Sequence, residues 1–242
     1  AVRAGTDGAG TNAAPGTAVV TAFDRIAQTV ETLRRIRQCV PAPAEVLVHI
    51  DANQLACAGA VRTSGLADGI LVSQTRVGPG GGRNRLLEAA RHPIVASFAD
   101  DSWPLDEDYF HRLPVLFERF PDAAVIGASI FHRGEPRPEA RDDAEWRADF
   151  VGAGCAYRRD AFLATGGYVP LPTAYGMEEV DLSLRRHARG QRILHSNWLR
   201  IEHDTDLSHH ASAEVTAASI ANIALLTCLR YPVSLWVVGL AQ

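Results

Sequence analysis

Residues 93–104 read PIVASFADDSWP, an apolar run that ends in the acid pair Asp100-Asp101. The short apolar stretch from Pro93 to Phe98 predicts a buried strand. Ionised carboxylates at the end of a buried strand need a partner, and a hard divalent cation that bridges to a substrate phosphate would supply one. A turn in which one aspartate caps the next helix would explain the same pair.

The part of the chain before this strand alternates between strand and helix patterns. Thr17–Thr21 and Glu45–Ile50 predict strands separated by an amphipathic helix, and Gly69–Ser73 predicts a third strand. A glycine-rich segment, Gly78–Asn84, then leads into a helix predicted at Arg85–Ala90. This alternation, with acids or glycines where strands end, predicts an α/β fold whose parallel sheet carries a site along its carboxyl edge.

The glycine-rich segment GPGGGRN, residues 78–84, has two explanations. Consecutive glycines before a helix allow the backbone to approach a ligand closely, and the amino end of a helix attracts anions. The segment lacks the Gly-Lys-Ser/Thr ending of a Walker A loop and is not a complete dinucleotide fingerprint. A plain flexible turn explains it equally well.

The second half of the chain is less regular. Ala123–Ile130 predicts a strand, and Arg133–Trp146 is a polar, proline-containing excursion that we interpret as a lid. Phe150–Tyr157 (FVGAGCAY) is rich in small residues and offers either a backbone ledge for a ligand or tight strand packing. The other predicted elements are a short helix at Arg159–Ala164, a helix at Glu178–Arg189, strands at Arg192–Leu194 and Leu199–His203, and a final helix at Ala213–Leu229.

A second acid cluster, Glu178-Glu179-Val180-Asp181, opens the helix predicted at Glu178–Arg189. Glu178 and Asp181 stand three residues apart and share one helix face, whereas Glu179 points elsewhere. Two carboxylate sites in different environments suit a reaction that needs both a cation site and a proton acceptor. Acids in a first helical turn also simply complement the helix dipole.

Composition limits the partners of this chain. The 242 residues carry a net charge of −4, so no global positive field attracts nucleic acid, and we expect no nucleic-acid partner. All 24 basic residues are arginine, which makes every fixed cation available to a phosphate a guanidinium. The four cysteines show no close metal-ligand spacing, and we expect buried free thiols in a reducing cytoplasm.

The two ends of the chain differ from its middle. Residues 1–17 are rich in glycine, alanine and threonine and predict a disordered leader. The stretch from Asn222 to Gln242 is apolar, and it suits packing on the core, a homodimer contact or contact with a membrane surface. The absence of a basic face disfavours the membrane, and no apolar stretch reaches transmembrane length.

Seven segments of the chain, taken in order, resemble family 2 glycosyltransferases of the GT-A fold. The resemblance runs from about Val19 to His210 through VVTAFDR, VLVHID, GPGGGRN, FADDSWP, FVGAGCAYRRDAF, GMEEVDLSLR and WLRIEH. It implies transfer of a sugar, with inversion, from a nucleotide-diphosphate donor to an acceptor hydroxyl of a small molecule or glycan, with Mg²⁺ or Mn²⁺ as the cofactor. The implied fold is a Rossmann-like, mostly parallel sheet flanked by helices, with a smaller mixed region on the acceptor side.

The resemblance divides the chain into parts. A nucleotide-sugar-binding half is predicted at residues 18–104 and an acceptor and catalytic half of the same domain at residues 105–212. A C-terminal helical segment is predicted at residues 213–242. Donor contacts are implied for Thr21, Phe23, Arg25, Asp51, Arg83, Asn84 and Asp100.

The resemblance also assigns the metal, the base and the acceptor side. Asp101 corresponds to the family's metal-binding last acid and His203 to a histidine near the metal, although the first acid of the motif appears here as Ala99. Glu179 stands where the family usually has an aspartate as the catalytic base. The implied acceptor-side residues are Trp103, Gly152, Gly154, Glu178 and Asp181.

Two other functions remain open on the sequence. Nucleotidyl transfer uses a similar sheet and cation, but it usually needs a glycine-rich loop with arginine and lysine near the amino terminus. Here the first predicted strand leads into AFDR, and the chain contains no lysine. A non-catalytic domain that binds a sugar nucleotide and partners another protein is favoured by Ala99.

Overall fold

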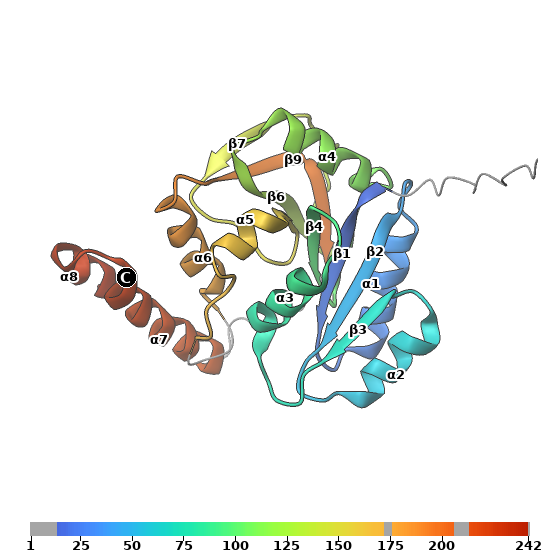
Figure 1. Ribbon diagram of the computed structural model, residues 1–242, viewed down its shortest axis with the longest axis horizontal. Helices are drawn as coiled ribbons and strands as arrows, with labels where there is room; N and C mark the ends of the chain where they lie inside the picture. The colour runs from blue at the N-terminus through green and yellow to red at the C-terminus, as the bar shows by residue number, and fades with distance from the viewer. Residues whose placement is uncertain (1–13, 172–175, 206–212, 242) are drawn as a thin grey trace, which may run out of the picture.

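A nine-stranded sheet organises the chain in this computed structural model, which describes residues 14–171, 176–205 and 213–241 (Figure 1). The strands pair in the order β3-β2-β1-β4-β8-β6-β9-β5, and β7 also pairs with β9. Their bounds are β1 (Ala14–Ala22), β2 (Pro43–Ile50), β3 (Gly69–Val72), β4 (Ile94–Ala99), β5 (Ser102–Pro104), β6 (Ala123–His132), β7 (Ala144–Arg147), β8 (Cys155–Arg158) and β9 (Arg192–His203).

Most strands of the sheet point the same way, as the alternating pattern predicted, although the eight strand pairs divide into four parallel and four antiparallel. β3, β2, β1 and β4 pair in parallel, and so do β6 and β9. β8 runs antiparallel to both β4 and β6, so β6 points the same way as β4. The carboxyl ends of β1 to β4, β6 and β9 therefore meet at one edge of the sheet.

Helices cover both faces of the sheet. One face carries α1 (Ile26–Arg37), α2 (Leu55–Ser64) and α4 (Tyr109–Arg119). The other face carries α3 (Gly78–Ala89), α5 (Arg159–Ala164) and α6 (Glu178–His187). The chain ends with α7 (Ala213–Arg230), the short 3₁₀ helix η2 (Val233–Leu235) and α8 (Trp236–Leu240).

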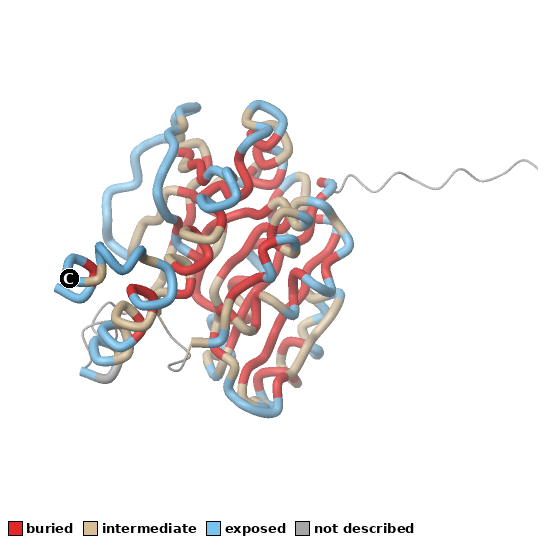
Figure 2. The backbone as a smooth tube through the Cα atoms, turned by 60° about the vertical axis from the view of Figure 1, so that its left-hand side comes forward, coloured by how far each residue is buried: buried red, intermediate tan, exposed pale blue. Residues whose placement is uncertain are grey.

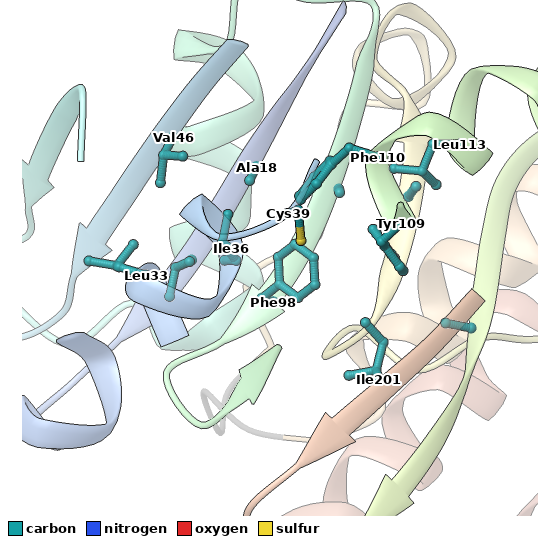
Figure 3. Packing of buried hydrophobic residues seen from close by; sticks show 14 of the residues in the cluster. Ala18, Leu33, Ile36, Cys39, Val46, Phe98, Tyr109, Phe110, Leu113 and Ile201 are labelled. Atoms are coloured by element: carbon teal, nitrogen blue, oxygen red, sulfur yellow. The ribbon is translucent and has the colours of Figure 1, made fainter. Parts of the chain in front are cut away.

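Alternating strand residues divide the core between the two faces. The central strands β1, β2, β4 and β8 are buried along most of their length (Figure 2), whereas β3 is half-buried and β7 is largely exposed. On the face of α1 and α4, Phe98 of β4 lies between Ile36 and Tyr109, with 5.8 Å between the ring centroids of Phe98 and Tyr109 (Figure 3). Apolar side chains of Val19 and Val95 point to the opposite face, where they pack beneath α3.

The C-terminal helices project away from the sheet (Figure 1). α7 is tied to α6 through Arg230, whose Nε donates to Asp181 Oδ1 at 2.7 Å. Asn222 of α7 also donates to the carbonyl of Gly176 at 2.9 Å. Over the described parts of the chain, no helix combines the length and the apolar character needed to cross a bilayer.

The structure corrects several predicted bounds. Residues 14–17, assigned to the leader, begin β1, and residues 1–13 lie outside the described residues. The two predicted strands after α6 are one strand, β9, whose pairing with β6 jumps from Ser196 to Arg200 across a bulge. The polar excursion contains β7, where the Arg192 guanidinium lies 3.6 Å from the centroid of the Trp146 ring.

The largest correction concerns the glycine-rich segment, which is helical. α3 begins at Gly78 rather than at Arg85, because the Asp51 carboxylate accepts hydrogen bonds from the Val77 and Gly78 amides at 2.9 Å each. A Cβ on Gly82 would lie 2.6 Å from Nδ1 of His49 on β2. Glycine at that position therefore lets the helix lie close to the sheet.

Glu45 gives the fold a measurable pH dependence. Its buried carboxylate accepts hydrogen bonds from the Thr17 hydroxyl at 2.7 Å and from the Arg91 amide and Nε at 2.9 and 2.6 Å. Burial alone would raise the pKa of Glu45, but these hydrogen bonds and the Arg91 charge lower it. The stabilisation is therefore present above the pKa of the unfolded chain and is lost as the pH falls through the folded pKa.

We expect Glu45→Gln to lower the free energy of unfolding by about 1–3 kcal/mol at pH 7, because it weakens a buried charge-assisted network. The gap from the wild type should close as the pH falls below about 4. Urea unfolding at a series of pH values measures this, with Glu118→Gln on the exposed side of α4 as the control. A gap that stays constant down to about pH 3 would contradict the assignment.

Candidate active site

Several of the predicted site residues lie where the parallel strands end. Phe23 and Arg25 follow β1, Asp51 follows β2, and Asp100 and Asp101 follow β4. His203 is the last residue of β9 and pairs with Ser102 of β5, next to Asp101. These residues come from strands that are far apart in the sequence, and the parallel order of the sheet brings them to one edge.

Asp101 holds two partners at this edge. Its Oδ2 accepts a hydrogen bond from Arg25 Nη1, and its Oδ1 lies 3.1 Å from His203 Nε2. Burial alone would raise the pKa of Asp101, but the contact with His203 and then the charge of Arg25 lower it. Asp101 is therefore an ionised carboxylate at neutral pH.

Asp100 lies in a different environment from its neighbour. Burial raises the pKa of Asp100 to about 6, and the charge of Asp101 adds to the rise. The Phe23 amide donates to Asp100 Oδ2 at 3.4 Å, and Arg25 Nη1 lies 3.7 Å from Oδ1. The pair thus presents one firmly ionised acid and one that is nearer to protonation.

Asp101 and His203 are two side chains at this edge that could hold a divalent cation. They offer a carboxylate oxygen and an imidazole nitrogen, and both are donors that Mn²⁺ accepts. In the described parts of the chain, no three His, Cys, Asp or Glu side chains gather into a complete ion site. Cations that are held by one or two protein ligands complete their shell with substrate phosphates and water.

A second centre forms around Arg83 on α3. Its side chain is only 4% exposed, Nε donates to Ser97 Oγ at 3.1 Å, and Nη1 donates to Glu179 Oε1 at 3.2 Å. Ser97 in turn donates to the carbonyl of Gly152 at 3.0 Å. The contacts join α3, β4, the segment before β8 and the first turn of α6 at one point.

Glu179 is the acid at this centre. Burial raises the pKa of Glu179 to about 7, and the neighbouring charge of Glu178 adds to the rise, whereas Arg83 opposes it. The side chain remains 20% exposed. A carboxylate of this kind takes up and releases a proton near neutral pH, which is the property of a general base.

Asp51 and Asn84, both expected on the donor side, use their hydrogen-bonding groups within the chain. Asp51 accepts from the amides of Ala52, Val77 and Gly78 and holds the start of α3. Asn84 donates to the Tyr168 carbonyl and accepts from the Tyr168 amide, each at 2.8 Å. These contacts fix the loop that carries the Tyr168 ring beside Arg83.

The two remaining donor-side residues lie at the end of β1. Thr21 is buried there, and Phe23 is half-buried. The Arg76 guanidinium lies over the Phe23 ring, 5.3 Å from its centroid. This exposed arginine was not among the predicted residues, and a guanidinium over an aromatic ring offers a surface on which a base could stack.

The predicted acceptor-side residues do not lie together. Asp181 is fully buried in ion pairs with Arg185 and Arg230, so it offers no surface to an acceptor. Trp103 lies under Arg35 of α1, on the opposite face of the sheet from α6. The Oε2 atom of Glu178 is buried and has no hydrogen-bond partner among the residues that the structure describes.

Of the two glycines of the predicted ledge, Gly152 touches the second centre and Gly154 does not. A Cβ on Gly152 would lie 2.1 Å from Glu179 Oε1 and 2.7 Å from Arg83 Cζ. Gly154 has a φ of +139° and lies against Ile201. Ser97, which supports Gly152, was missed by the sequence analysis, although it is the single polar residue within the apolar run of β4.

No protein-family model and no curated protein sequence matches this chain, but solved structures do. GalNAc-T7 with UDP, GalNAc and Mn²⁺ matches with a TM-score of 0.67 at 13% identity, over 87% of this chain and 47% of that one. The mannosyltransferase PcManGT from Pyrobaculum calidifontis, in complex with GDP-Man and Mn²⁺, matches with a TM-score of 0.66 at 17% identity. That match covers 88% of this chain and 62% of the mannosyltransferase.

A third similar structure is S. aureus TarS in complex with UDP-GlcNAc, with a TM-score of 0.63 at 14% identity over 90% of this chain and 67% of that one. At such identities the likeness establishes the fold, which is the GT-A fold of glycosyltransferases. The chain spans about half of GalNAc-T7 and about three fifths of the mannosyltransferase.

We expect Gly152→Ala to destabilise the protein by about 1–3 kcal/mol, because the added methyl group overlaps the Arg83–Glu179 pair. The matched control is Gly59→Ala on α2, where no atom lies within 4 Å of the added Cβ. That control should be neutral or more stable by up to about 1 kcal/mol. Chemical denaturation measures the free energy of unfolding of both variants. Equal stability would show that a methyl group at position 152 can be accommodated and would contradict the expected overlap.

Proposed function

We propose that this chain is an inverting glycosyltransferase that moves a sugar from a nucleotide-diphosphate donor to an acceptor hydroxyl. The observation that carries the proposal is Glu179, a partly exposed carboxylate with a pKa of about 7, held against the Gly152 ledge of a GT-A fold. A base with that pKa can accept a proton from an alcohol at neutral pH and release it afterwards.

The edge near Asp101 supports the donor half of the proposal. Arg25 places a guanidinium beside Asp101, and Arg76 lies over Phe23 at the end of β1. Fixed cations near a diphosphate stabilise the charge that grows on it as the bond to the sugar breaks. The similar structures contain UDP, GDP-Man or UDP-GlcNAc, which supports a nucleotide sugar as the donor here.

The mechanism is a single displacement at the anomeric carbon. Glu179 takes the proton of the acceptor hydroxyl while that oxygen attacks, and the absence of a side chain at Gly152 lets the Glu179 carboxylate lie against the backbone. Asp101 and His203 would hold Mg²⁺ or Mn²⁺, which supplies Lewis-acid screening of the diphosphate when bound. Arg25 orients the Asp101 carboxylate by its hydrogen bond.

The polar excursion after β6 lies close to the metal residues and stays a candidate lid. Arg133 pairs with Asp204 at 2.6 Å, and Arg137 pairs with Glu202. Asp204 and Glu202 flank His203, so the ion pairs fasten the excursion over the end of β9. Opening would break the Arg133 pair, which is exposed on the arginine side and contributes little free energy, but it would also leave the buried Glu202 carboxylate without Arg137.

The C-terminal helices support the homodimer predicted from the sequence. They carry a set of exposed apolar side chains, which is a feature of association surfaces. Its members are Ile220, Leu229, Val233, Leu235, Val237, Val238 and Leu240. A cytoplasmic location remains a prediction from the cysteines, which form no disulfide in the described residues.

We expect Glu179→Gln to reduce the transfer rate by about 10²–10⁴-fold, because the amide cannot accept the proton. Binding of nucleoside diphosphate, measured by calorimetry, should be unchanged. Glu88→Gln, an exposed change on α3, is the control and should keep the wild-type rate. A panel of nucleotide sugars provides the assay; near-normal turnover of the Glu179→Gln variant removes the base role, and pyrophosphate release would indicate nucleotidyl transfer.

Chelation tests the cation. EDTA should abolish transfer, and an excess of Mn²⁺ or Mg²⁺ should restore it, whereas EDTA already saturated with Mn²⁺ should have no effect. His203→Gln should need a higher Mn²⁺ concentration for half-maximal rate, because it removes one ligand. Transfer at full rate by the chelated protein would refute the cation assignment.

A further inference from the structure

The most deeply buried cation at the candidate site is Arg83. Burying a guanidinium costs several kcal/mol unless its donors and its charge are compensated. The compensating groups are the Ser97 hydroxyl, the Glu179 carboxylate and the Tyr168 ring, whose centroid lies 6.0 Å from Arg83 Cζ. Ser97 and Tyr168 are held in place by other parts of the chain.

The groups around Arg83 are themselves fixed. Ser97 is tethered to the Gly152 carbonyl, and Asn84 clamps both backbone groups of Tyr168. The Tyr168 hydroxyl lies 2.7 Å from the Tyr157 hydroxyl. With Nε bound to Ser97, the guanidinium has one orientation, and that orientation points Nη1 at Glu179.

Arg83 is the cation in direct contact with Glu179. The other titratable groups that interact electrostatically with Glu179 are Glu178 on α6, Cys155 on β8 and Tyr168 in the loop after α5. None of these three carries positive charge. The amide of Gly152 also favours the ionised form of the Glu179 carboxylate.

We propose that Arg83 is a positioning residue for the base: it holds the Glu179 carboxylate ionised and in one orientation against the Gly152 ledge. This differs from a role beside the nucleotide, because the guanidinium is buried and its orientation is set by Ser97. The inference rests on the proposed function only in naming Glu179 as the base. The ion pair and its effect on Glu179 can be measured without any transfer.

Kinetics separates this role from donor binding. We expect Arg83→Gln to lower kcat at pH 7 by about tenfold or more and to move the acid limb of the pH–rate profile upward by about one pH unit. The sign follows from charge, because removal of the cation makes the Glu179 carboxylate easier to protonate. Affinity for nucleoside diphosphate, measured by calorimetry, should change less than about threefold.

Three further variants distinguish the effect of the positive charge at position 83 from the effect of the orientation of the guanidinium. Arg83→Lys keeps the charge, so the acid limb should stay near its wild-type position, but kcat should fall because lysine cannot reach Ser97 and Glu179 together. Ser97→Ala keeps the guanidinium and removes its tether, with the same expected pattern. Arg85→Gln, on the exposed side of the same helix, should match the wild type in both readouts.

A direct titration is independent of activity. Carbon-13 NMR of protein labelled at the glutamate carboxyl groups, with Glu179→Gln to assign the signal, should show a higher midpoint for Glu179 in Arg83→Gln than in the wild type. An unmoved midpoint, or a loss of diphosphate affinity in parallel with kcat, would overturn the inference. If the wild type transfers no sugar but the midpoint moves, the proposed function fails and the positioning contact stands.

Discussion

The ion pair between Arg83 and Glu179 is the contact on which the geometry of the site depends, because it joins α3, β4 and α6 at one point. A buried pair of charges is tolerated only where its donors and acceptors are satisfied, so the surrounding chain has to fit closely around it. Glycine at positions 80 and 152 allows this close fit, because a side chain at either position would crowd its surroundings. A Cβ on Gly80 would lie 3.2 Å from Tyr168, and one on Gly152 would overlap the pair itself.

The general fold could be predicted from the sequence because it follows from local patterns. Short apolar runs that end in acids are the buried parallel strands β2 and β4, and their order along the chain fixed the sheet. The start of α3 could not be predicted, because glycine normally disfavours helix. Its helical state depends on the Asp51 carboxylate and on close packing against His49, which are contacts between segments distant in sequence.

That Asp51, Asp100 and Asp101 lie where parallel strands end could be predicted from the sequence, but the partners of individual side chains could not. The motifs predicted Asp101, His203 and Glu179 as site residues. In the structure Asp101 contacts His203, and Glu179 pairs with Arg83. Asn84 was expected beside the nucleotide, yet its amide is used by the Tyr168 backbone. A motif records which side chains occur together, whereas the assignment of each hydrogen bond depends on the tertiary approach of another segment.

The first turn of α6 shows why three acids in four residues need not share a role. Glu179 faces the Gly152 ledge and stays partly exposed, whereas Asp181 turns to the other side and is neutralised by Arg185 and Arg230. Since Arg230 belongs to α7, the acid that was expected near an acceptor instead fastens the C-terminal helices to the helix that carries Glu179. Helical spacing alone separates the two environments, because neighbouring residues on a helix point in different directions. The turn that carries Glu179 is therefore itself anchored by the ion pairs of Asp181.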